Sequence, residues 1–180
     1  SNVIDIRKMF KNCNNLREIT FGNNFETSKV TKLNEMFYGC SQIIELDLSS
    51  FDTKNVKSME YMFYDCSNLK TITINKTLFT TNEVENMNDM FSGCNSLISF
   101  DFSGFDTSSV KTMDRMFYSC SRITLIDITS FNSNNLESMN EMFYNCFELK
   151  KINFSPNFKK TYVREMNYAF TNCKTLRSLD

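Results

Sequence analysis

Seven cysteines are the side chains of this sequence with the widest choice of chemistry, because a thiolate can bind a metal, attack an electrophile or form a disulfide. They stand 26 to 28 residues apart, at Cys13, Cys40, Cys66, Cys94, Cys120, Cys146 and Cys173. Zinc sites use close pairs such as CxxC, and the chain has neither such a pair nor a histidine. An odd number of evenly spaced cysteines is also unlike a disulfide framework. We therefore expect a column of buried free thiols. Because neighbouring thiols would lie about 5 Å apart, bridging between some of them stays open.

Enzymatic chemistry has little support in the rest of the sequence. The absence of histidine removes the commonest general base, and the chain has no glycine-rich phosphate loop. Most acidic residues occupy repeated positions, whereas carboxylate catalysis needs a distinct pair. Eleven methionines suggest a soft-metal site or a plastic binding groove, but their spacing favours a place in the core. We expect a protein that is not an enzyme and that has no cofactor and no metal.

The cysteine step is one column of a repeat that runs through the whole chain. Phe63 precedes Cys66 by three residues and Leu69 follows it by three, and every other cysteine has the same kind of neighbours. The unit reads FDTxxVxxMxxMFxxCxxLxxIxI and is about 26 residues long. A fixed period of this length is typical of a solenoid, in which each unit packs on its neighbours. The sequence therefore predicts a single solenoid domain over residues 1–180, with six to seven repeats.

Spacing within the unit predicts an α/β, leucine-rich-repeat-like solenoid with one short helix and one short parallel strand per repeat. The segment 110–117 places Val, Met, Met and Phe on one face of a helix, and Thr107 or a neighbour would cap its start. The segment 125–128, LIDI, alternates with the period of two that a strand requires. The chain has one proline and four glycines, so its corners must be turned by another, repeated device.

Outward strand positions are the first candidate binding surface, because solenoids commonly bind partners on an extended concave face. The candidates are Glu45, Asp47, Thr71, Thr73, Ser99, Asp101, Leu125, Asp127, Lys151 and Asn153. This mixed acidic and hydroxyl strip suits a basic protein segment, or a Ca²⁺ ion between Asp101 and Asp127. A solvated sheet face without a ligand is the alternative for any single residue.

A row of tyrosines directly after the Phe column is the second candidate. Its members are Tyr38, Tyr64, Tyr118 and Tyr144. Tyrosine combines an apolar ring with a polar tip and is enriched at interfaces, so Tyr64 and Tyr118 join the candidate ligand-binding residues. A row that merely covers the edge of the core is the alternative. Ser92 interrupts the row, so no continuous tyrosine stripe is expected.

Charge and hydropathy exclude two classes of partner. Lys and Arg number 20 against 21 Asp and Glu, a net charge of -1, and no basic stripe is visible. We therefore expect no nucleic-acid partner. No apolar run approaches the length that spans a bilayer, so no direct membrane insertion of this segment is expected. The chain opens with SNVIDIRKMF, which lacks a signal-peptide pattern.

The repeat resembles repeats of known bacterial surface proteins. The segment MFxxCxxLxxIxI is similar to the AFxxCxxLxxIxLP portion of BspA-like leucine-rich repeats. The longer form, FDTKNVKSMEYMFYDC at 51–66 and FDTSSVKTMDRMFYSC at 105–120, closely resembles the repeat of mycoplasma-type surface lipoproteins. The resemblance covers essentially all 180 residues. It implies a leucine-rich-repeat-like solenoid on a cell surface, often adhesive or antigenic.

From these features we expect an extracellular, noncatalytic recognition or adhesion module at a cell surface, with a host or cell-surface protein as its partner. A structural spacer or antigenic array without a dedicated ligand is one alternative. An intracellular scaffold, favoured by the free cysteines, is another. Neither terminus resembles a polar cap, so we also expect the chain to be part of a longer array and to associate end to end.

Overall fold

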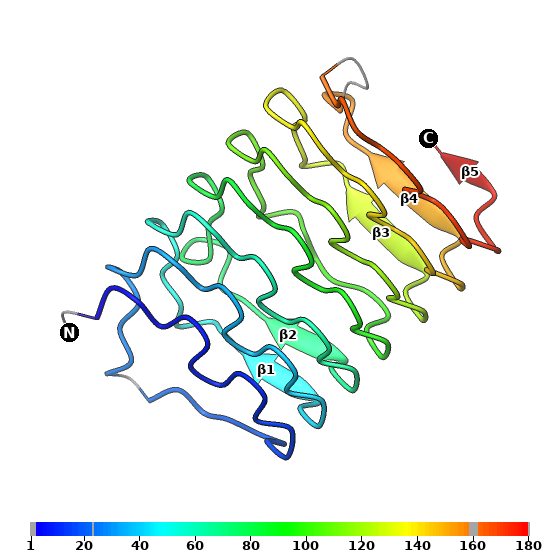
Figure 1. Ribbon diagram of the computed structural model, residues 1–180. Helices are drawn as coiled ribbons and strands as arrows, with labels where there is room; N and C mark the ends of the chain where they lie inside the picture. Colours follow the sequence, from blue (N-terminus) through cyan, green and yellow to red (C-terminus); the bar gives the residue numbers. More distant parts are fainter. Residues whose placement is uncertain (1–2, 23, 159–161, 180) are drawn as a thin grey trace.

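The chain forms seven stacked coils in the computed structural model, which describes residues 3–22, 24–158 and 162–179. Each coil contains one cysteine, and the coils are numbered 1 to 7 in that order. Figure 1 shows them side by side in sequence order, from the blue N-terminal coil to the red C-terminal coil. One residue of each coil pairs in parallel with its equivalent in the next, from Asp5 with Lys32 through to Ser138 with Glu165. The repeat of the sequence is therefore the repeat of the structure.

Short parallel strands form one layer of the stack. A first sheet pairs β1 (Glu45–Asp47) with β2 (Thr71–Thr73). A second sheet has the order β3 (Leu125–Ile128), β4 (Lys151–Phe154) and β5 (Ser178–Leu179). Pairing joins equivalent positions of neighbouring repeats, so the predicted parallel strands are confirmed in these five coils.

Coil 4 lies between the two sheets and its segment 99–101 belongs to neither strand ladder. Phe100 and Phe102 stand here where the neighbouring repeats carry pairs of isoleucines, Ile72 with Ile74 and Ile126 with Ile128. The two rings cross edge to face with centroids 4.6 Å apart, and Phe102 also meets the ring of Phe131, about one repeat further along the chain, at 5.7 Å. The prediction of one strand in every repeat is therefore only partly correct.

The helix predicted in every repeat is wrong, since the described residues contain no helix. The segment that leads to each cysteine is instead a run of turns, called the turn segment below. In coil 2, alternate N–H groups donate to carbonyls of coil 3 over 2.7–3.1 Å; the donors are Leu33, Glu35, Phe37 and Gly39. Between them, the N–H groups of Met36 and Tyr38 donate to the carbonyl three residues back, those of Leu33 and Glu35. A helix would use the carbonyl four residues back and would leave the next coil unbonded.

Positive φ angles make this alternation possible. In the described residues each coil has two of them, as at Asp89 (φ 53) and Gly93 (φ 76) in coil 4. Such a residue at the third place of a turn is the requirement of a type II turn. The place directly before the cysteine holds Gly, Asn, Asp or Ser, and most of these tolerate a positive φ. These residues, together with only four glycines, are the repeated device that turns the chain.

Inward side chains of all coils form one continuous core, which confirms the predicted Phe and Met columns. Seven phenylalanines, from Phe10 to Phe170, stack with ring centroids 5.3–5.9 Å apart. Met59, Met87 and Met113 are fully buried beside them. Flexible methionines fill irregular gaps between stacked rings, so the core can tolerate units of slightly different length.

Thr107 does not cap a helix, contrary to the sequence-based expectation. Its hydroxyl donates to the Asn132 carbonyl (2.9 Å) and accepts the Asn132 N–H (2.7 Å) in the next coil. Thr27 makes the same pair of bonds to Asp52, and Thr53 donates to Thr80 (2.6 Å). These buried hydroxyls satisfy backbone groups at the corner where two coils meet, which is why the FDT sequence recurs.

Gly93→Ala is expected to lower the free energy of unfolding by about 1–2 kcal/mol, because a Cβ is strained at positive φ. The new Cβ would also meet the Asp65 carboxylate of the coil before it. Gly22→Ala is the matched control, since no atom lies within 4 Å of the Cβ that it would add. Urea unfolding compares the two variants, and equal stabilities would contradict the turn geometry.

Candidate functional site

The cysteine column is a structural element of the stack. All seven cysteines are free, five are buried, Cys173 is partly exposed and Cys13 is exposed. Each thiol from coil 2 onward donates to the carbonyl of a Phe in the preceding coil, as Cys66 does to Phe37 over 3.1 Å. The expectation of seven buried thiols is wrong for Cys13 and Cys173, which lie in coils with a neighbour on one side only.

Burial makes these thiols poor nucleophiles. It raises the pKa of Cys40 to about 11 and the pKa of Cys120 to about 12. Burial also raises the pKa of Cys66, Cys94 and Cys146, and the neighbouring thiols add to the effect. Because the thiolate is the reactive form, these five buried thiols are poor nucleophiles near neutral pH.

The strand face carries the predicted strip with the predicted register. Glu45 lies beside Thr71, Asp47 beside Thr73, and Leu125 beside Lys151. All ten predicted residues of the strip reach the surface, with Asn153 partly covered and Leu125 43% exposed. The strip is therefore a surface of unlike side chains held in fixed rows.

Neither Asp101 nor Asp127 is arranged to bind Ca²⁺ with the other. Lys76 pairs with the Asp101 carboxylate, and this hydrogen bond lowers the pKa of Asp101 to about 2. Asn153 donates to Asp127 over 3.0 Å and, with Thr129, lowers the pKa of that carboxyl. No three metal-ligating side chains come together in the part of the chain that the structure describes. Both carboxylates are held by partners within the protein. They therefore do not form the Ca²⁺ site that their spacing suggested.

The tyrosine row lies on the turn segments as two stacked pairs. Tyr38 and Tyr64 have ring centroids 4.6 Å apart, and Tyr118 and Tyr144 are 5.1 Å apart. Ser92 takes the equivalent place in coil 4, between the pairs. Both Tyr64 and Tyr118 are partly buried, which suits the expectation of rings that cover the core edge and keep one side free.

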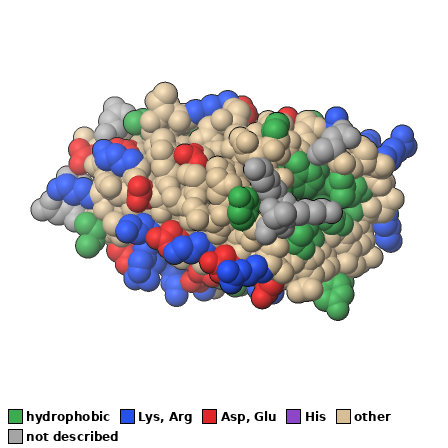
Figure 2. Space-filling model, turned by 90° about the horizontal axis from the view of Figure 1, so that it is seen from above, with side chains coloured by type: hydrophobic (Ala, Val, Ile, Leu, Met, Phe, Trp, Pro, Cys, Tyr) green, Lys and Arg blue, Asp and Glu red, His purple; other side chains and the backbone are tan. Residues whose placement is uncertain are grey.

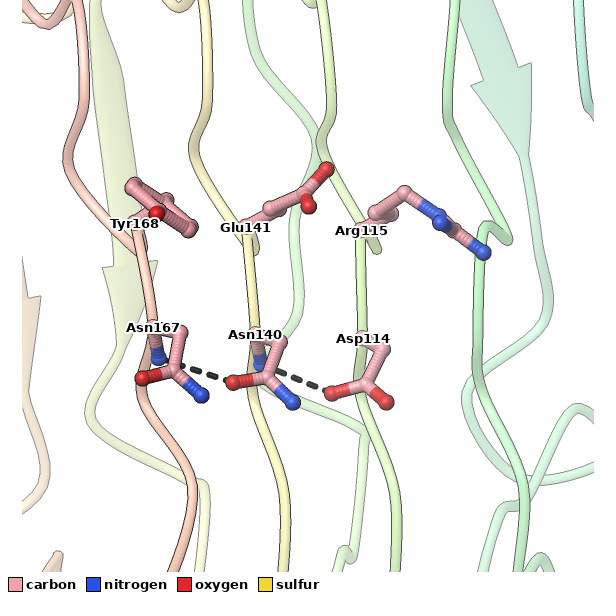
Figure 3. A pocket seen from close by; sticks show the side chains of 6 residues that line it. All are labelled: Asp114, Arg115, Asn140, Glu141, Asn167 and Tyr168. Carbon is pink, nitrogen blue, oxygen red and sulfur yellow. Dashed lines mark hydrogen bonds between the residues drawn. The ribbon is translucent and has the colours of Figure 1, made fainter.

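A polar column beside the tyrosines was not predicted from the sequence. The structure shows that its side chains hold the next coil: Asn88 accepts the N–H of Asp114 (2.8 Å), and Asp114 accepts that of Asn140 (2.7 Å). Figure 3 shows this bond and the equivalent one from Asn167 to Asn140. These oxygens complete the turn segments, because they accept the N–H groups that the backbone ladder leaves out.

The residues drawn in Figure 3 line an open hollow of ≈ 480 Å³ over coils 5 to 7. The side-chain oxygens of Asp114 and Asn140 accept hydrogen bonds between coils, and Asn140 also donates to Ser138 and Glu165. The hollow is thus lined mainly by groups with structural partners. Shape alone does not make it a binding site.

Asp89 is the most unusual ionisable group of the turn face. Its side chain is only 3% exposed, and the Arg115 Nε lies 3.2 Å from both carboxylate oxygens. Burial raises the pKa of Asp89, against the opposing effect of the Arg115 guanidinium. Burial and the charge of Asp89 likewise raise the pKa of Tyr61, whose ring lies 5.5 Å from that of Tyr64. The carboxylate of Asp89, the guanidinium of Arg115 and the rings of Tyr61 and Tyr64 therefore form one cluster across coils 3 to 5.

One signal in the sequence could have revealed the polar column. The two places between the methionines of MxxMF hold NE, EY, ND, DR, NE and NY in coils 2 to 7. The first place is always Asn, Asp or Glu, and in coils 4 to 6 the side chains there, those of Asn88, Asp114 and Asn140, accept the N–H of the next coil. The helix prediction gave these residues no role, so their contacts between coils were not predicted.

Parallel strands, stacked turns and ladders of equivalent residues together define a solenoid repeat protein. Residues 1–96 and 70–179 match the family described as Mycoplasma protein of unknown function, DUF285, and the chain belongs to that family. The match confirms the resemblance drawn from the FDTSSVKTMDRMFYSC type of repeat. No match was found among curated proteins.

Solved leucine-rich repeat structures show limited similarity. A leucine-rich repeat protein from Bacteroides ovatus is 22% identical with a TM-score of 0.49, over 84% of this chain and 41% of its own. A leucine-rich repeat protein of T. pallidum is 19% identical with a TM-score of 0.48, over 82% of this chain and 72% of its own. A leucine-rich cell surface protein from Faecalibacterium prausnitzii is 15% identical with a TM-score of 0.30, over 95% and 74%. The chain thus spans less than half the length of the first of these proteins.

The surface mixes charges of both signs. Figure 2, seen from above the stack, shows Lys and Arg alternating with Asp and Glu along one side, and hydrophobic side chains gathered toward one end. Lys111 pairs with Glu85 across neighbouring coils at 2.6 Å. Within the described residues, no helix has the length and apolar character needed to cross a membrane.

Thiol labelling should separate the cysteines in the native protein. Cys13 is expected to react at the rate of an open thiol, and the five buried cysteines only after denaturant is added, because burial suppresses the thiolate. Mass spectrometry of peptides labelled with iodoacetamide under reducing conditions measures each rate. Fast native labelling of Cys66 or Cys94 would contradict the buried column.

The raised thiol pKa values predict a loss of stability at high pH. In the unfolded chain a thiol ionises near its ordinary pKa of 9, but Cys120 in the fold does so only at about 12. Above pH 9 the unfolded state therefore binds fewer protons, and the free energy of unfolding falls by about 1.4 kcal/mol per pH unit for each such thiol. Between pH 8 and pH 10, the free energy of unfolding measured in urea should fall by about 1.4 kcal/mol less in Cys120→Ala than in the wild-type chain. The same drop in both proteins would contradict the assignment.

Proposed function

We propose that the chain is a noncatalytic protein-recognition module displayed at a cell surface, and that its strand face binds the partner. The observation that carries this proposal is the contrast between inside and outside. Inward positions repeat the same residue types in every coil, whereas the aligned outward positions Glu45, Thr71, Leu125 and Lys151 differ in charge and size. A row of fixed, unlike side chains is the kind of surface that can discriminate between partners.

The charges of the strand face suggest the chemistry of the partner. Glu18, Glu45 and Asp47 lie together around one shallow hollow near coils 1 to 3. Lys151 stands at the other end of the strip, beyond Leu125. A partner segment with basic residues facing coils 1 to 3 and an apolar residue facing Leu125 would match this order. Display at a cell surface rests on the resemblance of the repeat to those of surface proteins.

A structural spacer or antigenic array is the competing function, and an intracellular scaffold is a further one. A spacer needs only the stacked core and the hydrogen bonds between coils. It predicts that outward residues of the strand face can change without any loss of binding. The difference between the two functions is therefore a difference in the effect of surface substitutions.

Charge reversal on the strand face tests the proposal. Glu18→Lys with Glu45→Lys is expected to weaken capture of the partner by about tenfold, or about 1.4 kcal/mol, by removing its attraction for basic residues. The control variant, Glu83→Lys with Glu148→Lys, makes the same charge change at exposed positions outside the strip. Immobilised wild-type and variant chains are exposed to host matrix proteins, and each bound protein is then titrated against all three.

The outcome separates the functions directly. Loss of a bound protein with the strand-face variant but not with the control supports recognition by the strand face. Equal capture by all three chains, or the absence of any saturable binding, favours the spacer. Thermal unfolding of the variants ensures that both pairs of substitutions leave the fold intact, since surface changes usually alter stability by less than about 0.5 kcal/mol.

A further inference from the structure

The tyrosine row on the turn face lacks one ring. Two stacked pairs, Tyr38 with Tyr64 and Tyr118 with Tyr144, have centroid separations of 4.6 and 5.1 Å. Ser92 of coil 4 lies between them at the equivalent position, two residues before the cysteine. The backbone of the turn segments continues past this point, as the bonds from Phe91 to Met116 and from Gly93 to Tyr118 show. The gap is therefore in the side chains alone.

The gap is a real hollow, of ≈ 270 Å³. Tyr64 and Tyr118 line it from coils 3 and 5, two coils apart, which corresponds to about 10 Å at the spacing of neighbouring parallel chains. A flat ring placed midway would lie about 5 Å from each tyrosine, which is within the range that aromatic pairs prefer. The space is therefore large enough to hold one aromatic ring between the two tyrosines.

Buried polar groups give the hollow a defined lining. Ser92 is 3% exposed and Asp89 is 2% exposed, so both are covered parts of the structure rather than mobile surface groups. Tyr61, Arg115 and Glu141 complete the lining. The ion pair between Arg115 and Asp89 holds the guanidinium in place. The walls are thus organised by contacts within the protein.

Charge determines what can accompany the ring. Two carboxylates, those of Asp89 and Glu141, and one guanidinium, that of Arg115, line the hollow, which gives a net charge of -1. An anionic ligand is disfavoured at such a site, and an aliphatic one forgoes stacking on the two tyrosines. A ring with a cationic group beside it would stack on the faces of the two tyrosines and oppose the net negative charge of the lining.

We propose that this hollow, the tyrosine slot (Tyr61, Tyr64, Asp89, Ser92, Arg115, Tyr118 and Glu141), binds an aromatic side chain of a partner protein that has a basic residue next to it. The ring of the partner completes the interrupted row, and the basic residue faces Glu141. The slot lies on the turn segments and the strip on the strands. Recognition by the slot is therefore separate from recognition by the strand face, and either can fail without the other.

A tryptophan peptide is a direct probe, because the chain itself contains no Trp. The peptide acetyl-Gly-Lys-Trp-Lys-Gly-amide is titrated with the protein while its fluorescence is followed. We expect a saturable change in emission as the indole enters the slot. The same peptide with Tyr in place of Trp should compete, and the version with Leu, which has the same charge, should not.

Three variants show whether the slot is the site. Ser92→Tyr adds the missing ring, so it should raise the melting temperature and weaken peptide binding by about tenfold or more, since stacking contributes up to about 1.5 kcal/mol. Tyr118→Leu removes one wall and should weaken binding by a similar factor. Tyr144→Leu is the matched control, because it removes a stacked ring of the same row that does not line the slot.

The results that would overturn the proposal are equally definite. They are a titration without saturation, equal competition by the Leu peptide, full binding by folded Ser92→Tyr, or equal losses with Tyr118→Leu and Tyr144→Leu. If Ser92→Tyr does not fold, the comparison of Tyr118→Leu with Tyr144→Leu decides. The strand-face variant Glu18→Lys with Glu45→Lys should bind the peptide at least as well as Tyr144→Leu, so failure of one proposal does not decide the other.

Discussion

Backbone hydrogen bonds between coils are the interaction on which the rest of this structure depends. In the turn segment, every second N–H crosses to the next coil, while the N–H groups between them either close turns within their own coil or, as for Asp114 and Asn140, donate to a side-chain oxygen of the preceding coil. A coil without a neighbour would leave these donors and one face of its apolar side chains to water, so it would gain too little to offset the conformational entropy lost on ordering its residues. Single repeats are therefore unstable, and equivalent residues are forced into register along the stack.

The columns of the core and the surface follow from that register. Once Phe91 donates to Met116 of the next coil, the Phe, Met and Cys side chains of neighbouring coils must lie on top of one another. The cysteine suits its column because it is small, apolar and still able to donate to a Phe carbonyl of the coil before. On the outside, the same register fixes the strand strip and the tyrosine row. The register of the coils thus determines both the fold and the two candidate binding features, the strip and the tyrosine row.

Residue types and period were sufficient to predict the stacking, the parallel strands and the core columns. They failed on the turn segment, because three-residue turns return Val110, Met113 and Met116 to the inside at nearly the spacing of a helix face. The positive φ angles distinguish the two structures. Gly39 and Gly93 directly before a cysteine hinted at them, but Glu35 and its equivalents carry no such mark.

The candidate sites were predictable to the same extent. Which residues face outward on the strands depends on a period of two, so the strip from Glu45 to Asn153 could be deduced. The pairing of Asp101 with Lys76 could not be deduced, because it depends on how the segment 75–79 folds against the next coil. The slot beside Ser92 depends on the distance between rings two coils apart, which only the stacked structure supplies.

Hydrogen-bond geometry in the turn segment is the most direct test of this account. Nuclear magnetic resonance can detect scalar coupling through a hydrogen bond between an amide nitrogen and the carbonyl carbon that accepts its proton. The account predicts coupling from the amide of Phe91 to the carbonyl of Met116 in the next coil. Coupling from Phe91 to Met87, four residues back, would show a helix and would contradict it.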